Sequence, residues 1–388
     1  MIDTGQDVLD RARTARRGLF DLTRLTAAIS SRELGAVVAS SSPNVTYTGG
    51  SFIDFPPLIS FVVTTAAGAQ GIVMNEADSI YFREYSWIDD IRSYRYAASL
   101  VEANLEAVRL LAELLRELGA SDAVGVEETQ IPALYRDALA SELRGARLAD
   151  ATDVFDEVRV IKTPGEVELM RYAALASDKA IHTGFALARP GDSEQQLAAS
   201  IQGAATRLGA DGLDHADVHA GPHATIVHAW PMGLRLEPGQ IIHVDFGAVF
   251  GGYRTDIARN AVVGEATSEQ RRIYQPLADA KQAMLEAIRP GVTAGAVYDA
   301  GQRTIEAGGL VYPWGTLGHS IGLSIHEGFE ITRGSERVLE ENMVLNIEPS
   351  HIEARSARYH VEDNLVVTAD GARLLSDFSP TEQMAEIV

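Results

Sequence analysis

The stretch HVDFGAVFGGYRTDIAR, residues 243–259, decides the fold of the second half of this chain. Apolar and polar residues alternate on either side of its paired glycines, which predicts a β-hairpin that turns near Phe250 and Gly251. Asp245 and Asp256 are eleven residues apart, and an odd separation across an even-length turn places two residues on one face. The stretch therefore predicts two carboxylates side by side.

A related stretch, NIEPSHIEARSARYHVED at residues 346–363, follows about 100 residues later. Glu348 lies 103 residues after Asp245, and Glu362 lies 106 residues after Asp256. The two glutamates are fourteen residues apart, so this second hairpin needs an odd loop or a bulge to place them on one face. We expect that it has one.

The whole second half repeats with this period. Arg189-Pro190-Gly191 recurs as Arg289-Pro290-Gly291, and each copy separates two helix-like stretches, the first of which opens at a capping threonine, Thr163 or Thr267. We expect an α+β domain made of two half-domains that face each other across a pseudo-twofold axis. Such an axis brings the four acids to one place.

The first part of the chain, residues 1–158, predicts a separate α/β domain. Its β-like runs alternate with long amphipathic helices, the clearest of which covers residues 98–118. The basic segment at residues 159–162 leads into the capping box of the next helix. We therefore expect the second domain to cover residues 159–388.

Composition limits the function. The chain has 388 residues, no cysteine and a formal charge of −21 at pH 7. This charge repels phosphate backbones and anionic lipid headgroups, so neither nucleic acid nor a membrane is an expected partner. Residues 1–20 lack the apolar core of a secretory signal, and the uncharged residues 55–75 are broken by prolines and glycines into two short strands. A cysteine-free chain contains no disulfide, and we expect a cytoplasmic protein.

Four carboxylates in one place require a cation. At an effective dielectric near 20, each pair about 4 Å apart repels by roughly 4 kcal/mol, and the four together by on the order of 20 kcal/mol. Oxygen ligands with one imidazole suit Mn²⁺, Fe²⁺, Co²⁺ or Zn²⁺ better than Cu²⁺. The imidazole candidate lies in GHSIGLSIHE, residues 318–327, where His319 has no counterpart in the first repeat and is the expected fifth ligand. His326 pairs instead with His228, at an offset of 98, and we expect both to act on the substrate.

These residues resemble a known family. The region from about residue 159 to 368 resembles the catalytic "pita-bread" domain of the peptidase M24 superfamily, which includes methionine aminopeptidase, the Xaa-Pro peptidases (prolidase and aminopeptidase P) and creatinase. SPNVTYTGG at residues 42–50 and RVIKTPGEVELMRYAA at residues 159–174 resemble the N-terminal domain and linker of the creatinase/prolidase branch. The resemblance covers nearly the whole chain and implies a creatinase-like α/β domain followed by a pita-bread domain.

The resemblance also implies a site for two divalent metal ions, Mn²⁺ first, with Co²⁺, Fe²⁺ or Zn²⁺ as alternatives. In the family pattern, Asp256 and Glu362 bridge the two metals, Asp245 holds one, and His319 and Glu348 hold the other. A homodimer is implied as well.

The expected reaction is hydrolysis of a C–N bond in a small peptide or a small amide. A metal ion lowers the pKa of a bound water from 15.7 to about 7, which provides a nucleophile at neutral pH. Glu348 is expected to move the proton, while His228 and His326 stabilise the oxyanion and assist the leaving nitrogen. The sequence thus predicts an Xaa-Pro dipeptidase- or aminopeptidase-like enzyme. The alternatives are an ectoine hydrolase-like or creatinase-like hydrolase of a small amide or amidine, and a binding module without catalysis.

Three departures from the family pattern fall where substrate is recognised. The arginine that usually stands two residues before the last glutamate ligand is His360 here, and an imidazole is a poor substitute for a bidentate guanidinium. Trp314 stands where a histidine is common, and the proline that commonly follows the His-Glu pair is replaced around Gly328-Phe329. We expect His360 and Trp314 to contact the substrate.

Three further histidines, His215, His219 and His223, recur every four residues, as they would on one face of a helix. Gly221-Pro222 breaks any such helix. We therefore expect no second metal cluster there, and we expect His223 to line the pocket.

Overall fold

The structure is a computed structural model that describes residues 3–52, 58–96 and 98–388. It divides into two compact units. The N-terminal unit comprises residues 7–159 and 163–166. The C-terminal unit comprises residues 160–162 and 167–388, together with residues 3–6.

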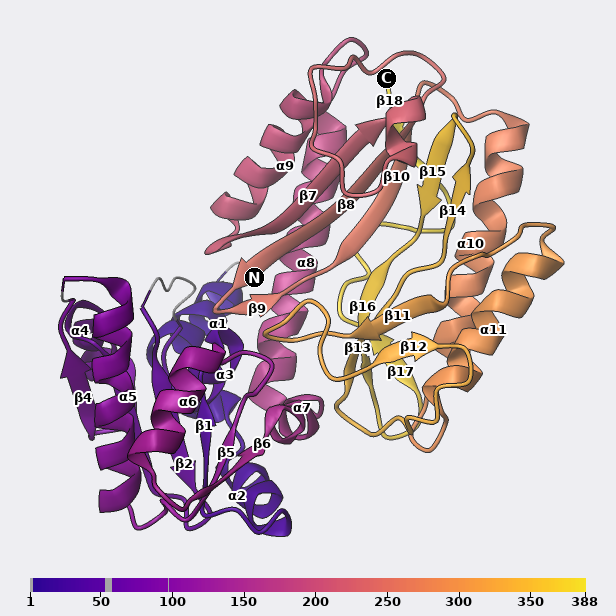
Figure 1. The fold of residues 1–388 in the computed structure, drawn as a ribbon. Coiled ribbons are helices and arrows are strands. Elements are labelled where there is room, and N and C mark those ends of the chain that lie inside the picture. The colour runs from indigo at the N-terminus through magenta and orange to yellow at the C-terminus, as the bar shows by residue number, and fades with distance from the viewer. Residues whose placement is uncertain (1–2, 53–57, 97) are drawn as a thin grey trace. The chain divides into compact units, whose positions relative to one another are not determined.

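The N-terminal unit is built on one mixed sheet of six strands in the order β4-β3-β2-β1-β5-β6 (Figure 1). β1, β5 and β6 run parallel, β2 runs antiparallel to both of its neighbours, and β3 and β4 run parallel. Following α1 (Asp3–Thr14), the elements are η1 (Arg16–Leu19), α2 (Leu22–Ser31), β1 (Ala36–Ala39), α3 (Ser42–Gly49), β2 (Phe61–Thr65), β3 (Gln70–Asn75), α4 (Glu76–Tyr85), β4 (Ile91–Tyr94), α5 (Leu100–Glu117), β5 (Ala123–Val126), α6 (Ala133–Glu142), β6 (Arg147–Asp150) and α7 (Thr152–Arg159).

The uncharged stretch forms the antiparallel pair β2 and β3, which confirms the two predicted strands, while residues 53–57 lie outside the described residues. Helix α5 buries Val108, Leu111 and Leu115 in the core of the unit, whereas Val101 in its first turn is 45 % exposed. The apolar face of this helix is thus shorter than its sequence pattern indicates. Among the described residues, no helix combines the length and apolarity needed to cross a membrane.

The C-terminal unit contains two sheets and two pairs of helices. Its elements are α8 (Pro164–Leu187), α9 (Glu194–Arg207), β7 (Gly212–Ala220), η2 (Gly221–Thr225), β8 (Ile241–Phe250), β9 (Tyr253–Arg254), β10 (Ile257–Val263), α10 (Ser268–Ala287), α11 (Ala294–Ala307), β11 (Thr316–Ser320), β12 (Glu330–Thr332), β13 (Val344–Ile347), β14 (Ser350–Glu353), β15 (Ala357–His360), β16 (Asp363–Val367), β17 (Ala372–Leu374) and β18 (Ala385–Ile387). The sheets have the orders β18-β10-β8-β7 and β12-β11-β13-β16-β17, and β14 and β15 form a separate ribbon.

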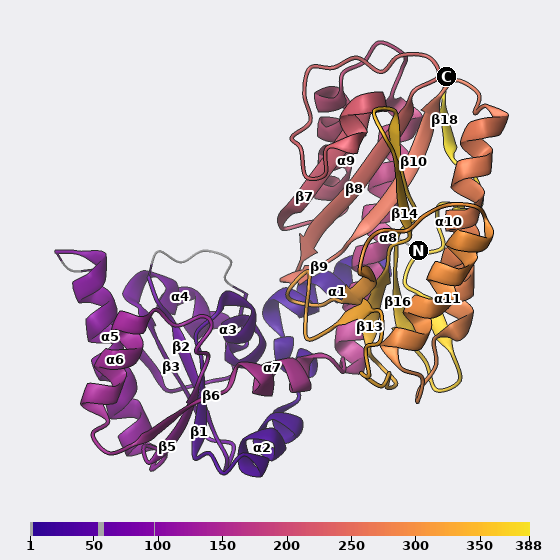
Figure 2. The same ribbon diagram turned by 45° about the vertical axis from the view of Figure 1, so that its right-hand side comes forward.

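The two sheets are built alike, which confirms the internal repeat. In each, three neighbouring strands (β7, β8 and β10, or β11, β13 and β16) follow a pair of helices, and α10 and α11 pack side by side in both views (Figures 1 and 2). The Gly191 N–H donates to the Leu236 carbonyl at 2.8 Å, and the Gly291 N–H donates to the Leu339 carbonyl at 2.9 Å. The recurring Arg-Pro-Gly turns therefore make the same contact in both copies.

The first helix of each copy begins as the sequence predicts. Thr163 accepts a hydrogen bond from the Glu166 N–H at 3.2 Å, and the Glu166 carboxylate accepts one from the Thr163 N–H at 2.7 Å. Thr267 and Gln270 form the same capping box at the start of α10. Such a box satisfies backbone donors that the first helical turn leaves free.

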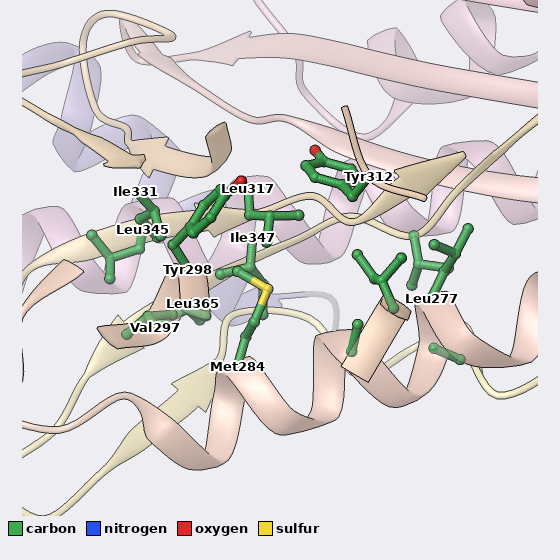
Figure 3. Close-up of a cluster of buried hydrophobic side chains, with 14 of the residues drawn as sticks. Leu277, Met284, Val297, Tyr298, Tyr312, Leu317, Ile331, Leu345, Ile347 and Leu365 are labelled. Carbon is green, nitrogen blue, oxygen red and sulfur yellow. The ribbon is translucent and has the colours of Figure 1, made fainter. Parts of the chain in front are cut away.

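The apolar core beneath the second sheet supports the strands of the site. Leu277, Met284 and Val297 from α10 and α11 pack with Leu317 of β11 and Ile347 of β13, as Figure 3 shows. Each fully buried side chain of this kind contributes roughly 1.5–3 kcal/mol. Since successive strand residues point to opposite faces, burial of Ile347 directs its successor away from this core.

Candidate metal centre

The hairpin of β8 and β10 holds Asp245 and Asp256 on one face. The chain reverses at Gly251 and Gly252, whose positive φ values of 56° and 88° suit a two-residue hairpin turn. The register pairs Asp245 with Ala258, so Asp256, two residues before Ala258, lies diagonally across from Asp245 on the same face. The face that the two aspartates share is the one their spacing predicts.

The second hairpin places Glu348 opposite Glu362. β13 pairs with β16 and β14 with β15 in one continuous register, and the two glutamates fall opposite each other between these ladders. The loop between β14 and β15 consists of residues 354–356, and Arg355 at its centre has a φ of 61°. The odd loop that the spacing requires is thus present.

Side chains of the second half-domain hold Asp256 in place. The amides of Asn346 and Asn364 each donate to the Asp256 carbonyl at 3.0 Å, and the Asp256 N–H donates to Asn364 Oδ1 at 3.2 Å. His319 Nε2 lies 3.4 Å from Asp256 Oδ2. The sequence analysis missed both asparagines. Each stands two residues from a predicted glutamate ligand on the same face of its strand, which is the signal that could have found it.

A cavity of about 460 Å³ opens onto these side chains. All five predicted metal ligands line it, together with His228, His326 and Trp314. Much of the remaining wall is apolar and is formed by Val227, Tyr312, Ile325 and Ile352. Of the described residues that line the cavity, Arg358 is the one with a permanent positive charge.

The two histidines predicted to act on the substrate lie at the open side of this cavity. The His326 ring stacks on the His319 ring with centroids 4.0 Å apart, and its Nδ1 lies 2.7 Å from Glu330 Oε1. The His228 side chain is 85 % exposed, and its Nδ1 lies 3.4 Å from Asp217 Oδ2. Both imidazoles are therefore within reach of a ligand that enters from solvent.

Burial and mutual repulsion make full ionisation of the acids unfavourable. Burial and the charges of Asp256 and Asp245 raise the pKa of Glu348 to about 7, against an opposing effect of His319. Burial, followed by repulsion from the other three carboxylates, raises the pKa of Glu362 well above its usual value. A cation would relieve both effects, as the sequence argument for a metal site requires.

The donor atoms fit divalent ions. Asp256, His319 and Glu362 each offer an atom within 4.8 Å of the others, and neighbouring groups of three share members with this one. Glu362 Oε2 is buried and has no hydrogen-bond partner among the described residues. Oxygen and imidazole donors of this kind are the ligands of first-row divalent ions. The geometry thus defines the class of site, a cluster of carboxylates and imidazoles suited to more than one metal ion.

His215 is a member of this cluster that the sequence analysis set aside. It lies on strand β7 rather than on a helix, with Nε2 3.1 Å from Asp245 Oδ1 and 3.2 Å from Asp256 Oδ1. Burial alone would lower the pKa of His215, but hydrogen bonds with Asp214 and these two aspartates raise it strongly. The sequence analysis considered these histidines only as a second, separate cluster and did not assign His215 to the site of the predicted ligands, where the structure places it.

Two residues expected to contact substrate lie outside the cavity. The turn at Gly221-Pro222 directs His223 toward α9, where its Nδ1 lies 2.9 Å from both carboxylate oxygens of the buried Glu194. His360 is 1 % exposed and lies behind the acids, with its Nδ1 3.6 Å from Asp245 Oδ2. Burial and the nearby Arg358 charge lower the pKa of His360 to about 3, so it remains uncharged. Only Trp314 of the three lines the cavity.

Comparisons with known proteins agree with this class of site. Residues 168–369 match the family described as "Metallopeptidase family M24", and residues 22–161 match the "Creatinase/Prolidase N-terminal domain". The "Probable dipeptidase PepE" of Mycobacterium tuberculosis is 32 % identical over 364 residues, covering 90 % of this chain and 92 % of that protein. The "Xaa-Pro dipeptidase" of Pyrococcus horikoshii is 26 % identical over 345 residues, covering 88 % and 93 %.

Solved structures show the same architecture. The dipeptidase PepE from Mycobacterium ulcerans has a TM-score of 0.81 at 28 % identity, covering 98 % of each chain. The X-Pro aminopeptidase from Thermotoga maritima has a TM-score of 0.82 at 20 % identity, covering 95 % of this chain and 100 % of that one, a likeness of fold. The chain therefore belongs to metallopeptidase family M24. It consists of a creatinase-like N-terminal domain and an M24 catalytic domain, and it is a metal-dependent peptidase.

Proposed function

We propose that this peptidase cleaves Xaa-Pro dipeptides with the aid of two divalent ions, Mn²⁺ first among them. The observation that carries the proposal is the cavity in which Asp245, Asp256, His319, Glu348 and Glu362 converge beside the exposed imidazoles. When bound, such ions supply the Lewis acidity that activates water and polarises a carbonyl. We keep residues 1–158 and 159–388 as the proposed domains and place all of this chemistry in the second.

The chain's own residues divide the remaining work. Glu348 faces the cavity among the proposed metal ligands, so it is placed to accept a proton from the nucleophile and return it to the leaving nitrogen. His326 and His228 line the same cavity and can donate hydrogen bonds to an oxyanion or to the amide that is cleaved. Asn346 and Asn364 keep Asp256 in position.

The cavity wall suits a small substrate with an apolar ring and a carboxylate. Tyr312, Trp314 and Ile325 offer the apolar surface that a prolyl ring would cover. Arg358 is 8 % exposed, and its buried Nε has no hydrogen-bond partner among the described residues. Its Nη2 lies 4.0 Å from Asp245 Oδ2, and a guanidinium on the wall of a cavity is suited to a carboxylate. Arg358 therefore replaces the family arginine whose position His360 occupies.

A hydrolysis panel on the Mn²⁺-loaded enzyme tests the proposal. The panel compares Xaa-Pro dipeptides, longer Xaa-Pro peptides, dipeptides without proline, ectoine and unrelated small amides. We expect the highest kcat/KM for Xaa-Pro dipeptides, and a selective rise of KM for them in Arg358→Met. Faster turnover of ectoine or of another non-peptide amide would replace the proposal with a small-amide hydrolase, and inactivity on every substrate with two ions bound would favour a binding module.

We also propose a homodimer. Five large apolar side chains are exposed within one segment near the cavity, and Trp230, at 87 %, is the most exposed of them; the others are Ile226, Val227, Met232 and Leu234. Burial of such a patch against a second copy would remove apolar surface from water. Light scattering should give twice the chain mass for the wild type and a shift toward the monomer for Trp230→Glu, whereas a monomeric wild type contradicts the proposal. The cytoplasmic location stays a prediction that cell fractionation tests.

A further inference from the structure

We propose that His215 is a sixth protein ligand of the metal centre, so that the ion held by Asp245 has an imidazole of its own. The proposal rests on the dinuclear centre of the proposed function. It adds a sixth ligand to the five that the family pattern implies. Each of the two ions would then have one histidine ligand.

The distances are those of ligands around one ion. His215 Nε2 lies 3.1 Å from Asp245 Oδ1 and 3.2 Å from Asp256 Oδ1. Donor atoms with metal bonds of about 2.1 Å are about 3.0 Å apart along an octahedral edge and about 3.4 Å apart along a tetrahedral edge. His215, Asp245 and Asp256 also each offer one ligand atom within 4.8 Å of the others, as ligands of a shared ion require.

The other side of the imidazole is held as it is in metal-ligating histidines. His215 Nδ1 lies 3.2 Å from Asp214 Oδ2, and Asp214 Oδ1 forms an ion pair with Arg254. The Arg254 guanidinium also donates to the Leu323 carbonyl. A carboxylate on the second ring nitrogen fixes the tautomer and aims the first nitrogen at the metal. Arg254 and Asp214 thus form a hydrogen-bonded network that orients His215 as a metal ligand.

The backbone makes room for this ring. The pairing of β7 with β8 shifts register between Leu213 and His215, and such an irregularity re-aims a side chain. His215 faces Gly247, where an added Cβ would lie 2.5 Å from the imidazole Cε1. The glycine at position 247 thus leaves room for the ring on its way to the acids.

The arrangement mirrors that of His319. Strand β7 neighbours the strand that carries Asp245, and β11 neighbours the strand that precedes Glu348. Asp256 faces His215 through Oδ1 and His319 through Oδ2. An aspartate that bridges two ions would thus have an imidazole beyond each of its oxygens.

X-ray absorption of the Co²⁺-loaded enzyme separates a ligand from an imidazolium that only pairs with the acids. With two ions bound, the wild type should show an average of one imidazole per cobalt, and His215→Phe should show half of that. His219→Gln is the matched control, because His219 lies on the same face of β7 but its Nε2 lies 2.8 Å from the Ala229 carbonyl oxygen. The control should keep the wild-type average.

Metal affinity measured by chelator competition gives a second readout without substrate. Asp214→Asn should weaken binding of one of the two ions about 10- to 100-fold, since it removes the carboxylate that orients the imidazole. An average of half an imidazole per cobalt in both the wild type and His215→Phe would overturn the assignment while leaving the proposed function intact. A wild type that binds no ion would remove the metal centre and the proposed function together.

Discussion

Removal of the metal ions should make the stability of this protein strongly dependent on pH. Some carboxyl groups have a higher pKa in the folded chain than in the unfolded chain. At any pH between these two pKa values, such a group binds more protons in the folded state. The free energy of unfolding then falls as pH rises through that window. Burial and neighbouring acids raise the pKa of Glu348 from 4.5 to about 7. This shift corresponds to a loss on the order of 3 kcal/mol between pH 4.5 and pH 7.

His319 acts in the same direction at higher pH. Burial would lower its pKa, but Asp256 raises it from 6.5 to about 9, so the stability it contributes is complete below pH 6.5 and is lost as pH rises toward 9. Glu348 and His319 therefore act with the same sign from pH 4.5 to pH 9, whereas His360, whose pKa burial lowers to about 3, opposes them below pH 6.5. Divalent ions reverse the effect, because they favour ionised acids and neutral imidazole.

The assay is urea unfolding of the chelated protein at pH 5.5 and pH 8.5, followed by tryptophan fluorescence. The apoprotein should be less stable at pH 8.5 by a few kcal/mol, the Mn²⁺-loaded protein should not, and apo Glu348→Gln should show a smaller difference. Equal apoprotein stability at the two pH values, or higher stability at pH 8.5, would refute the reasoning. If the stability difference between the two pH values is the same in apo Glu348→Gln as in the wild type, the assignment of the effect to this residue is refuted.

The remaining predictions concern three single substitutions. Asp256→Ala should reduce the metal content from two ions per chain to one or none with an unchanged circular dichroism spectrum, and two retained ions would contradict the bridging role. Asp363→Ala should lower the free energy of unfolding by about 3–5 kcal/mol, since its carboxylate lies 2.7 Å from both buried Arg259 and buried Lys281; a loss below 1 kcal/mol would show that these charges find other partners. His326→Gln should lower kcat about 10²- to 10⁴-fold at unchanged metal content, and an unchanged kcat would remove it from the reaction.

The sequence predicted those parts of the site that depend on whether two residues are an odd or an even number of positions apart. The odd separation of Asp245 and Asp256 and the even separation of Glu348 and Glu362 each specify a turn, and both turns are present. Parity works here because side chains alternate between the faces of a strand, so spacing alone determines the face. The internal repeat relates the two hairpins to each other, and this relation predicted that their four acids share one site.

The sequence could not place His215, because a spacing of four residues fits one face of a helix and also, as an even number, one face of a strand. Gly221-Pro222 excluded a helix, but the same spacing also fits a strand, and the segment forms strand β7. Asp217 and His219 fall on this same face, opposite Asp245 and His243. A period of two over these polar residues was the signal for a strand whose polar face lies beside the acids.

The substrate residues were harder to predict, since burial of a side chain is not visible in a motif. His360 occupies a family position for substrate recognition, yet it is buried beside His243, with His243 Nε2 3.3 Å from His360 Nδ1. Arg358, two residues earlier on the same face of β15, reaches the cavity instead. Which of the two lines the cavity depends on how strand β15 packs against its neighbours, and this is a tertiary property.

Anomalous diffraction from crystals of the Mn²⁺-loaded protein tests the central claim most directly. The account predicts two manganese peaks in the cavity, both within about 2.0–2.3 Å of oxygens of Asp256 and Glu362, with His319 bound to one of the two ions. A single peak, or peaks away from these carboxylates, would contradict the dinuclear centre on which the proposed function depends.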